Sequence, residues 1–333
     1  MLQIAPPPYV LISKTNWSDA PRIRHQLANL LTEKGHPVYF VQKNGFAKSL
    51  HLEKKSQLLT LVRHGELLHH QMRITPFVRA LNRKFEQSQI AKLSKHIEAP
   101  EVRILNFNYD STYLRSVFPN NQITTLIHDD YIAGARRWIR RATKSQLAQT
   151  LQQSERVLAV STPLVKQSQQ LGKQAELFLP WARSRYEHPP RTPTRNEVLY
   201  WGYLYENCDL NAFRHLSAHG ITINIIGPVS SSKSVTEILN QPRIKYHGIA
   251  SLSEMRPVVD RCCCSIVPYS LEALSGTFRA VTMSNRGFEL LAHGLPLLYS
   301  DLPALLPAPS KIVRKCKTLD EFLEGYRLAR ENF

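Results

Sequence analysis

The chain has 333 residues, 43% of them hydrophobic and 21% charged, which is a globular composition and a length that predicts two domains. No run of about 18 apolar residues occurs, and the N-terminus lacks the basic start and cleavage site of a signal peptide, so neither a membrane span nor a secretory leader is expected. The formal net charge is +17, of which residues 1–183 carry +14, which favours an anionic partner for that half, with a merely solubilising basic surface as the alternative.

The first 182 residues show a repeated strand–helix–strand pattern. A strand and loop at 9–17 precede a helix with Ile23, Leu27, Leu30 and Leu31 on its expected apolar face, a glycine stop at Gly35 and the strand "PVYFVQ". Such units build a parallel sheet with helices outside it. Three more strands are expected at 102–109, 123–130 and 156–161, with a helix at 143–155, while 48–100 reads as mixed strand, loop and helix.

The composition changes at residues 183–196, a polar and proline-rich stretch that reads as a linker. A second α/β series follows, which predicts two doubly wound domains at 1–182 and 197–333, facing each other across a cleft. Ligands of such folds bind outside the carboxyl ends of the strands. The elements expected in the second series are 198–204, 211–220, 221–228, 244–249, 253–262, 264–269, 285–293, 295–300, 311–316 and 318–330.

Five cysteines occur, three of them consecutive in "DRCCCSIVPY". Their spacing fits neither a disulfide framework nor a metal site. We expect small buried residues on a core strand of a reduced, cytoplasmic protein.

The helix expected at 285–293 carries an unusual pair. Ser284 is a suitable N-cap, Gly294 a suitable stop, and Arg286 and Glu289 stand three residues apart. A helix start attracts phosphate, and a cation there opposes the helix dipole unless an anion binds. A nucleoside diphosphate would satisfy Arg286 through its phosphates and Glu289 through ribose hydroxyls. The alternative is a surface ion pair.

The stretch "SNRGFELLAHGLPLLYSDLP" resembles the donor-binding segment of GT-B glycosyltransferases, notably glycosyltransferase family 4 and related polysaccharide-assembly enzymes. The resemblance implies that Arg286 meets the donor diphosphate and that Glu289 holds the ribose. "VLYWGYLYENCDLNAFRHL" and "TTLIHDDY" resemble other segments of these enzymes. The further donor-binding candidates are Gly202, Tyr203, Ser275, Gly276, Thr277, Arg279, Ser284 and Asn285, of which 275–277 could equally be plain loop.

Candidate catalytic residues stand at the end of the strand expected at 123–130. His128, Asp129 and Asp130 lie at its carboxyl end. An inverting enzyme would use one carboxylate as base, whereas in a retaining family 4 reaction His128 would contact the donor sugar. The structural alternative makes Asp129 a helix cap and His128 a satisfied polar residue. Arg24 and His25 are candidates for the acceptor side, and a solvated helix face explains them equally well.

No Asp-x-Asp, Gly-x-Gly-x-x-Gly or Walker lysine loop occurs, so we expect no metal and no cofactor beyond the nucleotide sugar as co-substrate. Basic residues alternate with aromatic ones in "RRWIRRATK" (136–144) and "RALNRKF" (79–85), which suits an anionic bilayer. The sequence therefore predicts a peripheral glycosyltransferase on the inner face of the cytoplasmic membrane. It would extend a glycan or lipid-diphosphate-linked acceptor in cell-surface polysaccharide synthesis. A non-catalytic glycan or nucleotide binder and a nucleic-acid-binding protein are the alternatives.

Overall fold

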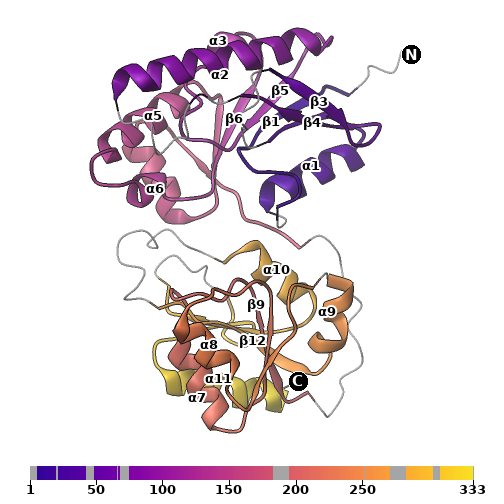
Figure 1. Cartoon of the computed structure of the whole chain (residues 1–333), viewed down its shortest axis with the longest axis vertical. Coiled ribbons are helices and arrows are strands. Elements are labelled where there is room, and N and C mark those ends of the chain that lie inside the picture. The colour runs from indigo at the N-terminus through magenta and orange to yellow at the C-terminus, as the bar shows by residue number, and fades with distance from the viewer. Residues whose placement is uncertain are drawn as a thin grey trace. The chain divides into compact units, whose positions relative to one another are not determined.

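The computed structural model describes residues 6–19, 22–42, 49–65, 67, 75–182, 195–250, 252–270, 283–302 and 308–332. The chain divides into two compact units, Met1–Leu179 and Pro180–Phe333 (Figure 1). Within the described ranges, no helix has the length and apolarity that crossing a membrane requires.

An eight-stranded sheet forms the centre of the first unit. Its strands are β1 (Tyr9–Ile12), β2 (Val38–Val41), β3 (His51–Lys54), β4 (Leu59–Arg63), β5 (Arg103–Asn106), β6 (Ile123–Ile127), β7 (Arg156–Ala159) and β8 (Glu176–Leu177). They are ordered β3-β4-β2-β1-β5-β6-β7-β8, and β3 runs antiparallel to β4 while the other pairs are parallel. Order along the chain reverses between β1 and β5, so the crevice at their carboxyl ends is where this class of sheet binds ligands.

Helices cover both faces of this sheet. They are α1 (Ile23–Glu33), α2 (Pro76–His96), α3 (Leu114–Val117), α4 (Tyr131–Gly134), α5 (Arg140–Gln152) and α6 (Thr162–Gln170). One face packs Val10 and Ile12 of β1 against Ile90 and Leu93 of α2 in a continuous apolar cluster. On the other face α1 lies against β1 and β2, where the His25 ring stacks on Phe40. The described residues of the segment 48–100, which the sequence left mixed, include β3, β4 and the long helix α2.

The second unit has a six-stranded parallel sheet. Its strands are β9 (Glu197–Trp201), β10 (Ile223–Ile226), β11 (Ile244–Tyr246), β12 (Cys262–Val267), β13 (Leu297–Ser300) and β14 (Val313–Cys316). The order is β11-β10-β9-β12-β13-β14. This is the 3-2-1-4-5-6 order of a Rossmann fold, which reverses between β9 and β12.

Five helices flank this sheet: α7 (Leu210–Ala218), α8 (Lys233–Leu239), α9 (Leu252–Val259), α10 (Asn285–Ala292) and α11 (Leu319–Asn332). Successive residues of β9 face opposite sides, as a strand requires. Val198 and Tyr200 belong to the apolar cluster beneath α7, α8 and α11, whereas Leu199 belongs to the cluster beneath α9 and α10. The elements expected from the sequence are therefore present, with α5 beginning at Arg140 rather than at residue 143.

All five cysteines are buried free thiols, as the sequence predicted. The three consecutive cysteines depart from the alternation between faces that a regular strand shows. Cys262 belongs to one cluster, and both Cys263 and Cys264 belong to the other. The pairing of β12 with β9 shifts register between Cys262 and Cys264, and such a bulge turns two consecutive residues to one side.

Candidate functional site

Three glycines gather at the carboxyl edge of the second sheet. Gly202 follows β9, Gly227 follows β10, and Gly248 lies just beyond β11, where its carbonyl accepts a hydrogen bond of 2.7 Å from the Gly227 amide. A Cβ on Gly227, whose φ is +129°, would collide with the Gly202 carbonyl. Only glycine allows these two backbone segments to approach this closely. The sequence singled out Gly202 and missed Gly227 and Gly248, although each ends a predicted strand.

Arg286 lies directly over this glycine edge. Its Nη1 donates to the Trp201 carbonyl at 3.2 Å, and a Cβ on Gly202 would collide with the same nitrogen. Trp201 is the last residue of β9, so the guanidinium occupies the point where strand order reverses. Arg286 is exposed and forms no ion pair with a carboxylate of the described residues. A cation held here is available to an anionic ligand.

Glu289 lies on the same helix but is buried, with 4% of its surface exposed. The alternative of a surface ion pair with Arg286 is therefore wrong, because the two side chains have different environments. Gly287 and Leu290 of α10 are buried, and the half-buried Phe288 and Leu291 pack against the same apolar cluster.

One turn beyond Glu289, His293 is buried, and its Nδ1 lies 2.8 Å from the Glu289 carbonyl. Desolvation lowers the pKa of His293, so the ring is neutral at pH 7. This histidine is not among the residues predicted from the sequence. Its spacing of four residues from Glu289 is the signal that could have found it.

Other predicted donor residues lie around the same edge. Tyr203 is 45% exposed, and its ring stacks on Tyr205 at 5.0 Å with an interplanar angle of 7°. Ser284 is the N-cap residue of α10 and, like Asn285, is half-buried. The remaining candidates, Ser275, Gly276, Thr277 and Arg279, lie outside the described residues.

A second polar cluster occupies the carboxyl edge of the first sheet, and Arg24 is its centre. Only 5% of Arg24 is exposed, so a solvated helix face does not explain it. Nη1 donates to the Ser13 carbonyl at 2.8 Å and to Oγ1 of Thr15 at 2.5 Å, while Nη2 lies 2.8 Å from Nε2 of His128. Burial lowers the pKa of Arg24 to about 10, which leaves the guanidinium charged at neutral pH.

His128 is fixed by these contacts in one protonation state. Because a guanidinium can only donate, Nε2 must accept, and the ring proton is on Nδ1. The Tyr131 hydroxyl donates to the Phe107 carbonyl at 2.8 Å, and its oxygen lies 3.1 Å from Nδ1. Desolvation and then the Arg24 charge lower the pKa of His128 to about 3. A ring held neutral in this way is a poor proton acceptor and a good oriented hydrogen-bonding group.

The adjacent aspartates have different roles. Asp130 caps α4: its Oδ1 accepts from the Ala133 amide at 3.0 Å and from Nε2 of Gln167 at 2.9 Å. The structural alternative assigned such a cap to Asp129, and that assignment is wrong. Asp129 is exposed, and desolvation of its carboxylate is the main cause that raises its pKa. Of the two, Asp129 has the free approach that a general base needs.

Lys14 and Asp110, which the sequence analysis did not select, form a third part of this edge. Nζ of Lys14 lies 2.6 and 2.7 Å from the two oxygens of Asp110, whose side chain is 3% exposed. Lys14 has φ of +44°, the one left-handed non-glycine residue in the described ranges. Backbone strain of this kind concentrates at functional sites.

His25 has a structural role. Its Nδ1 accepts from the Arg22 amide at 3.1 Å, and its Nε2 donates to the Asn16 carbonyl at 3.0 Å. These bonds tie the start of α1 to the loop after β1 and leave neither ring nitrogen for a substrate. As with Arg24, burial rules out the solvated helix face.

No group of three or more histidine, cysteine, aspartate or glutamate side chains in the described ranges is placed to hold a metal ion. Independence of metal stays a prediction.

Comparison with solved structures identifies the fold. The chain is similar to a lipopolysaccharide outer core galactosyltransferase, WaaB, in its apo form, at 11% identity and a TM-score of 0.64, over 98% of this chain and 90% of that one. It is similar to sucrose-phosphate synthase from Thermosynechococcus elongatus, also at 11% identity and 0.64, over 98% and 94%. HepE of Anabaena, solved with UDP and glucose, matches at 10% identity and 0.56, over 97% and 90%.

The sequence matches no protein-family model, and no curated protein matches it. The structural likenesses span both units and nearly the whole length of each neighbour. Together with the two parallel-dominated sheets, they establish that the chain has the GT-B fold predicted from the sequence.

Proposed function

We propose that this protein is a glycosyltransferase that moves a sugar from a nucleotide-diphosphate donor to a glycan or lipid-linked glycan acceptor in cell-surface polysaccharide synthesis, without a metal ion. The observation that carries the proposal is the Arg286 guanidinium, held over Gly202 where strand order reverses in a Rossmann unit. A diphosphate leaving group needs positive charge as its bond to the sugar breaks, and a preorganised arginine supplies it.

The donor side of the proposal belongs to the second unit. Arg286 would bind the diphosphate, Glu289 the ribose hydroxyls, and the close glycine backbones of 202 and 227 would let the phosphates approach the strand ends. The exposed Tyr203 ring offers an apolar surface beside them. Among the structural neighbours, HepE was solved with UDP, which makes uridine nucleotides the first ligands to test.

The acceptor side belongs to the first unit. There His128, oriented by Arg24 and Tyr131, would bind a hydroxyl group of a sugar, and Asp129 would accept the proton in an inverting reaction. A retaining reaction would leave Asp129 without that role.

We also propose that the protein is peripheral on the inner face of the cytoplasmic membrane. Phe77 and Leu81 at the start of α2 are 76% and 49% exposed, and Trp138 is 62% exposed beneath the Arg136 guanidinium at 5.3 Å. Arg79 lines a small pocket together with Ile139 and Ala142, so the two segments are neighbours. Exposed apolar side chains among arginines support binding to an anionic bilayer.

Thermal shift against UDP, GDP, dTDP and their sugars tests the donor site. A bound nucleotide at 100 times its Kd stabilises the folded state by about 2.7 kcal/mol. We expect Arg286→Ala to weaken nucleotide binding roughly 10- to 100-fold, and Glu289→Gln to weaken it without unfolding the buried site. Arg214→Ala is the matched control, because Arg214 pairs with Glu237 away from this edge.

If no nucleotide raises the melting temperature, the donor assignment is wrong. Binding without hydrolysis or transfer of any nucleotide sugar would favour the non-catalytic alternative.

A further inference from the structure

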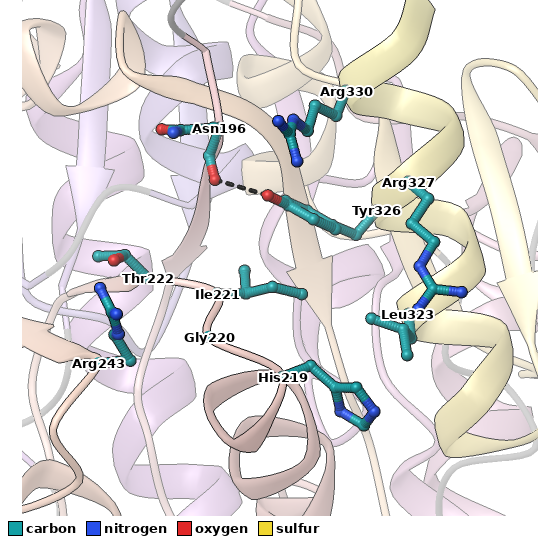
Figure 2. Close-up of a pocket in the computed structure, with 10 residues that line it drawn as sticks. All are labelled: Asn196, His219, Gly220, Ile221, Thr222, Arg243, Leu323, Tyr326, Arg327 and Arg330. Carbon is teal, nitrogen blue, oxygen red and sulfur yellow. Dashed lines mark hydrogen bonds between the residues drawn. The ribbon is translucent and has the colours of Figure 1, made fainter.

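A cavity lies at the edge of the second sheet opposite the donor site. It measures about 330 Å³. Its lining residues are Asn196, His219, Gly220, Ile221, Thr222, Arg243, Leu323, Tyr326, Arg327 and Arg330 (Figure 2). Asn196, Thr222 and Arg243 each directly precede a strand, at the amino ends of β9, β10 and β11. Gly202 and Arg286 lie at the carboxyl ends, so this cavity belongs to a different part of the fold.

Three arginines line the cavity, and none of its lining residues is acidic. Nine arginines are described in the second unit, and five of them pair with carboxylates: Arg195, Arg214, Arg256, Arg261 and Arg314. Of the other four, Arg286 lies at the donor edge. The remaining three, Arg243, Arg327 and Arg330, are the three that line this cavity. The arginines of this unit that lack a carboxylate partner in the described residues are therefore found at two sites.

A hydrogen bond joins two elements that line the cavity. The Tyr326 hydroxyl donates to the Asn196 carbonyl at 2.9 Å and ties α11 to the start of β9. Figure 2 shows Arg330 near this bond, while Arg243 extends toward Thr222 on the other side of the cavity. Tyr326 and Leu323 are buried. The positive side chains thus lie around a bond that joins two elements of the cavity wall.

One contribution opposes an anion here. Helix α7 ends at the cavity, and the carboxyl end of a helix carries partial negative charge. The last-turn carbonyls are, however, already engaged: Leu216 accepts from the Ile221 amide at 3.2 Å and Ser217 from the Gly220 amide at 3.0 Å. Three full charges outweigh the residual half charge of one capped helix end.

We propose that this cavity is a binding site for a small phosphomonoester, separate from the site for the nucleotide sugar. Arginine recognises phosphate through its planar array of donors, and two or more guanidinium groups can share one phosphate. The volume exceeds that of a bare phosphate and is at the small end of ligand pockets. The Thr222 hydroxyl and the Asn196 amide are neutral groups suited to the hydroxyls of the attached molecule. This inference does not depend on glycosyl transfer.

Isothermal titration of the full chain at low ionic strength tests the proposal, with glycerol 3-phosphate and glycerol as a matched pair of probes that differ only in the phosphate. The Arg286→Ala background removes the phosphate-binding arginine of the donor site. In that background we expect glycerol 3-phosphate to bind and glycerol not to bind. Adding Arg243→Ala and Arg330→Ala should weaken binding by at least about tenfold.

Arg214→Ala with Arg256→Ala in the same background removes an equal charge outside the cavity and should leave the affinity within about twofold. An equal loss of affinity in this control variant would mean a diffuse electrostatic effect and would overturn the proposal, as would equal binding of glycerol or no binding of glycerol 3-phosphate at all. Circular dichroism of each variant shows whether it is folded. Should the double variant unfold, Arg243→Lys and Arg330→Lys keep the charge without the planar fork, and tenfold weaker binding is again the expected result.

Discussion

Arg24 shows why single residues were the hardest part of this protein to predict. Its position in "RIRHQ" reads as the polar face of an amphipathic helix, and the periodicity of α1 places Leu30 on the apolar face. In the structure Leu30 is 36% exposed while Arg24 and His25 are nearly fully buried. Periodicity treats polar residues as solvent-facing, and it cannot register a charge whose hydrogen-bond partners come from distant loops. Ser13, Thr15 and His128 supply those partners.

A substitution at Gly227 is expected to cause a severe steric clash. Gly227→Ala would place its Cβ against the Gly202 carbonyl, a backbone atom that cannot move aside, at a φ of +129°. We expect a loss of more than about 3 kcal/mol in the free energy of unfolding, measured by urea denaturation. Gly248→Ala is the matched control, because its φ of +73° is also left-handed but no atom lies within 4 Å of the added Cβ. A loss of about 1 kcal/mol is expected there. Equal losses would show that the contact with Gly202 is not the cause.

The protonation state of His128 gives a pH prediction. Its pKa is about 3 in the folded chain and 6.5 in an unfolded one, so the unfolded state binds the extra proton between these values. Stability from this group is therefore complete above pH 6.5 and is lost as pH falls toward 3, by at most about 1.4 kcal/mol per pH unit. His128→Gln should flatten urea stability between pH 4 and 6 relative to the wild type. NMR of the ring is a direct check, and titration of His128 near pH 6.5 would contradict the fixed neutral state.

Helices and strands were easier to predict from the sequence than the environment of single side chains. Strands such as β1 and β9 are short runs of buried β-branched and aromatic residues, and Gly35 and Gly294 mark helix ends with φ of +85° and +79°. These signals depend only on residues that are near one another in the chain, so they can be detected in a single sequence. The segment 48–100 was unclear because β3 is half-exposed at the sheet edge and α2 has a mixed polar surface. Edge elements lack the apolar run or stripe on which prediction relies.

The N-cap of the short helix α4 distinguishes the roles of Asp129 and Asp130, which the sequence alone could not distinguish. Asp130→Ala removes its N-cap and the bond from Gln167, so we expect a loss of about 0.5–2 kcal/mol in unfolding free energy, largely restored in Asp130→Asn. Asp129→Ala should change stability by less than about 0.5 kcal/mol. If Asp129 is the base, its loss lowers kcat with little effect on KM. An Asp129→Ala enzyme of normal kcat would exclude that role.

On the scale of the whole molecule, the length of the chain and the change in composition at residues 183–196 predicted two domains, and the structure has two units with separate cores. Each unit has its own sheet and its own apolar clusters. The net charge is also divided unevenly between the two units. Of the charge of +17, residues 184–333 carry only +3. A basic first unit would suit the proposed acceptor on an anionic bilayer, whereas the proposed nucleotide sugar would need one well-placed cation rather than a basic surface.

This division predicts how the protein binds vesicles. In co-sedimentation, the full chain should bind vesicles of phosphatidylcholine and phosphatidylglycerol but not of phosphatidylcholine alone. Each Lys or Arg near the bilayer contributes about 1 kcal/mol, and that attraction weakens as salt shortens the Debye length.

Trp138→Ala with Phe77→Ala should reduce binding severalfold by removing exposed apolar side chains, and Arg136→Ala with Arg140→Ala should reduce both binding and its salt dependence. The matched control, Arg214→Ala with Arg256→Ala, takes the same charge from the second unit and should bind as the wild type does. Equal losses in both charge variants would place the membrane contact outside the basic surface of α2 and residues 136–144, and tight binding to RNA in place of vesicles would assign that surface to nucleic acid.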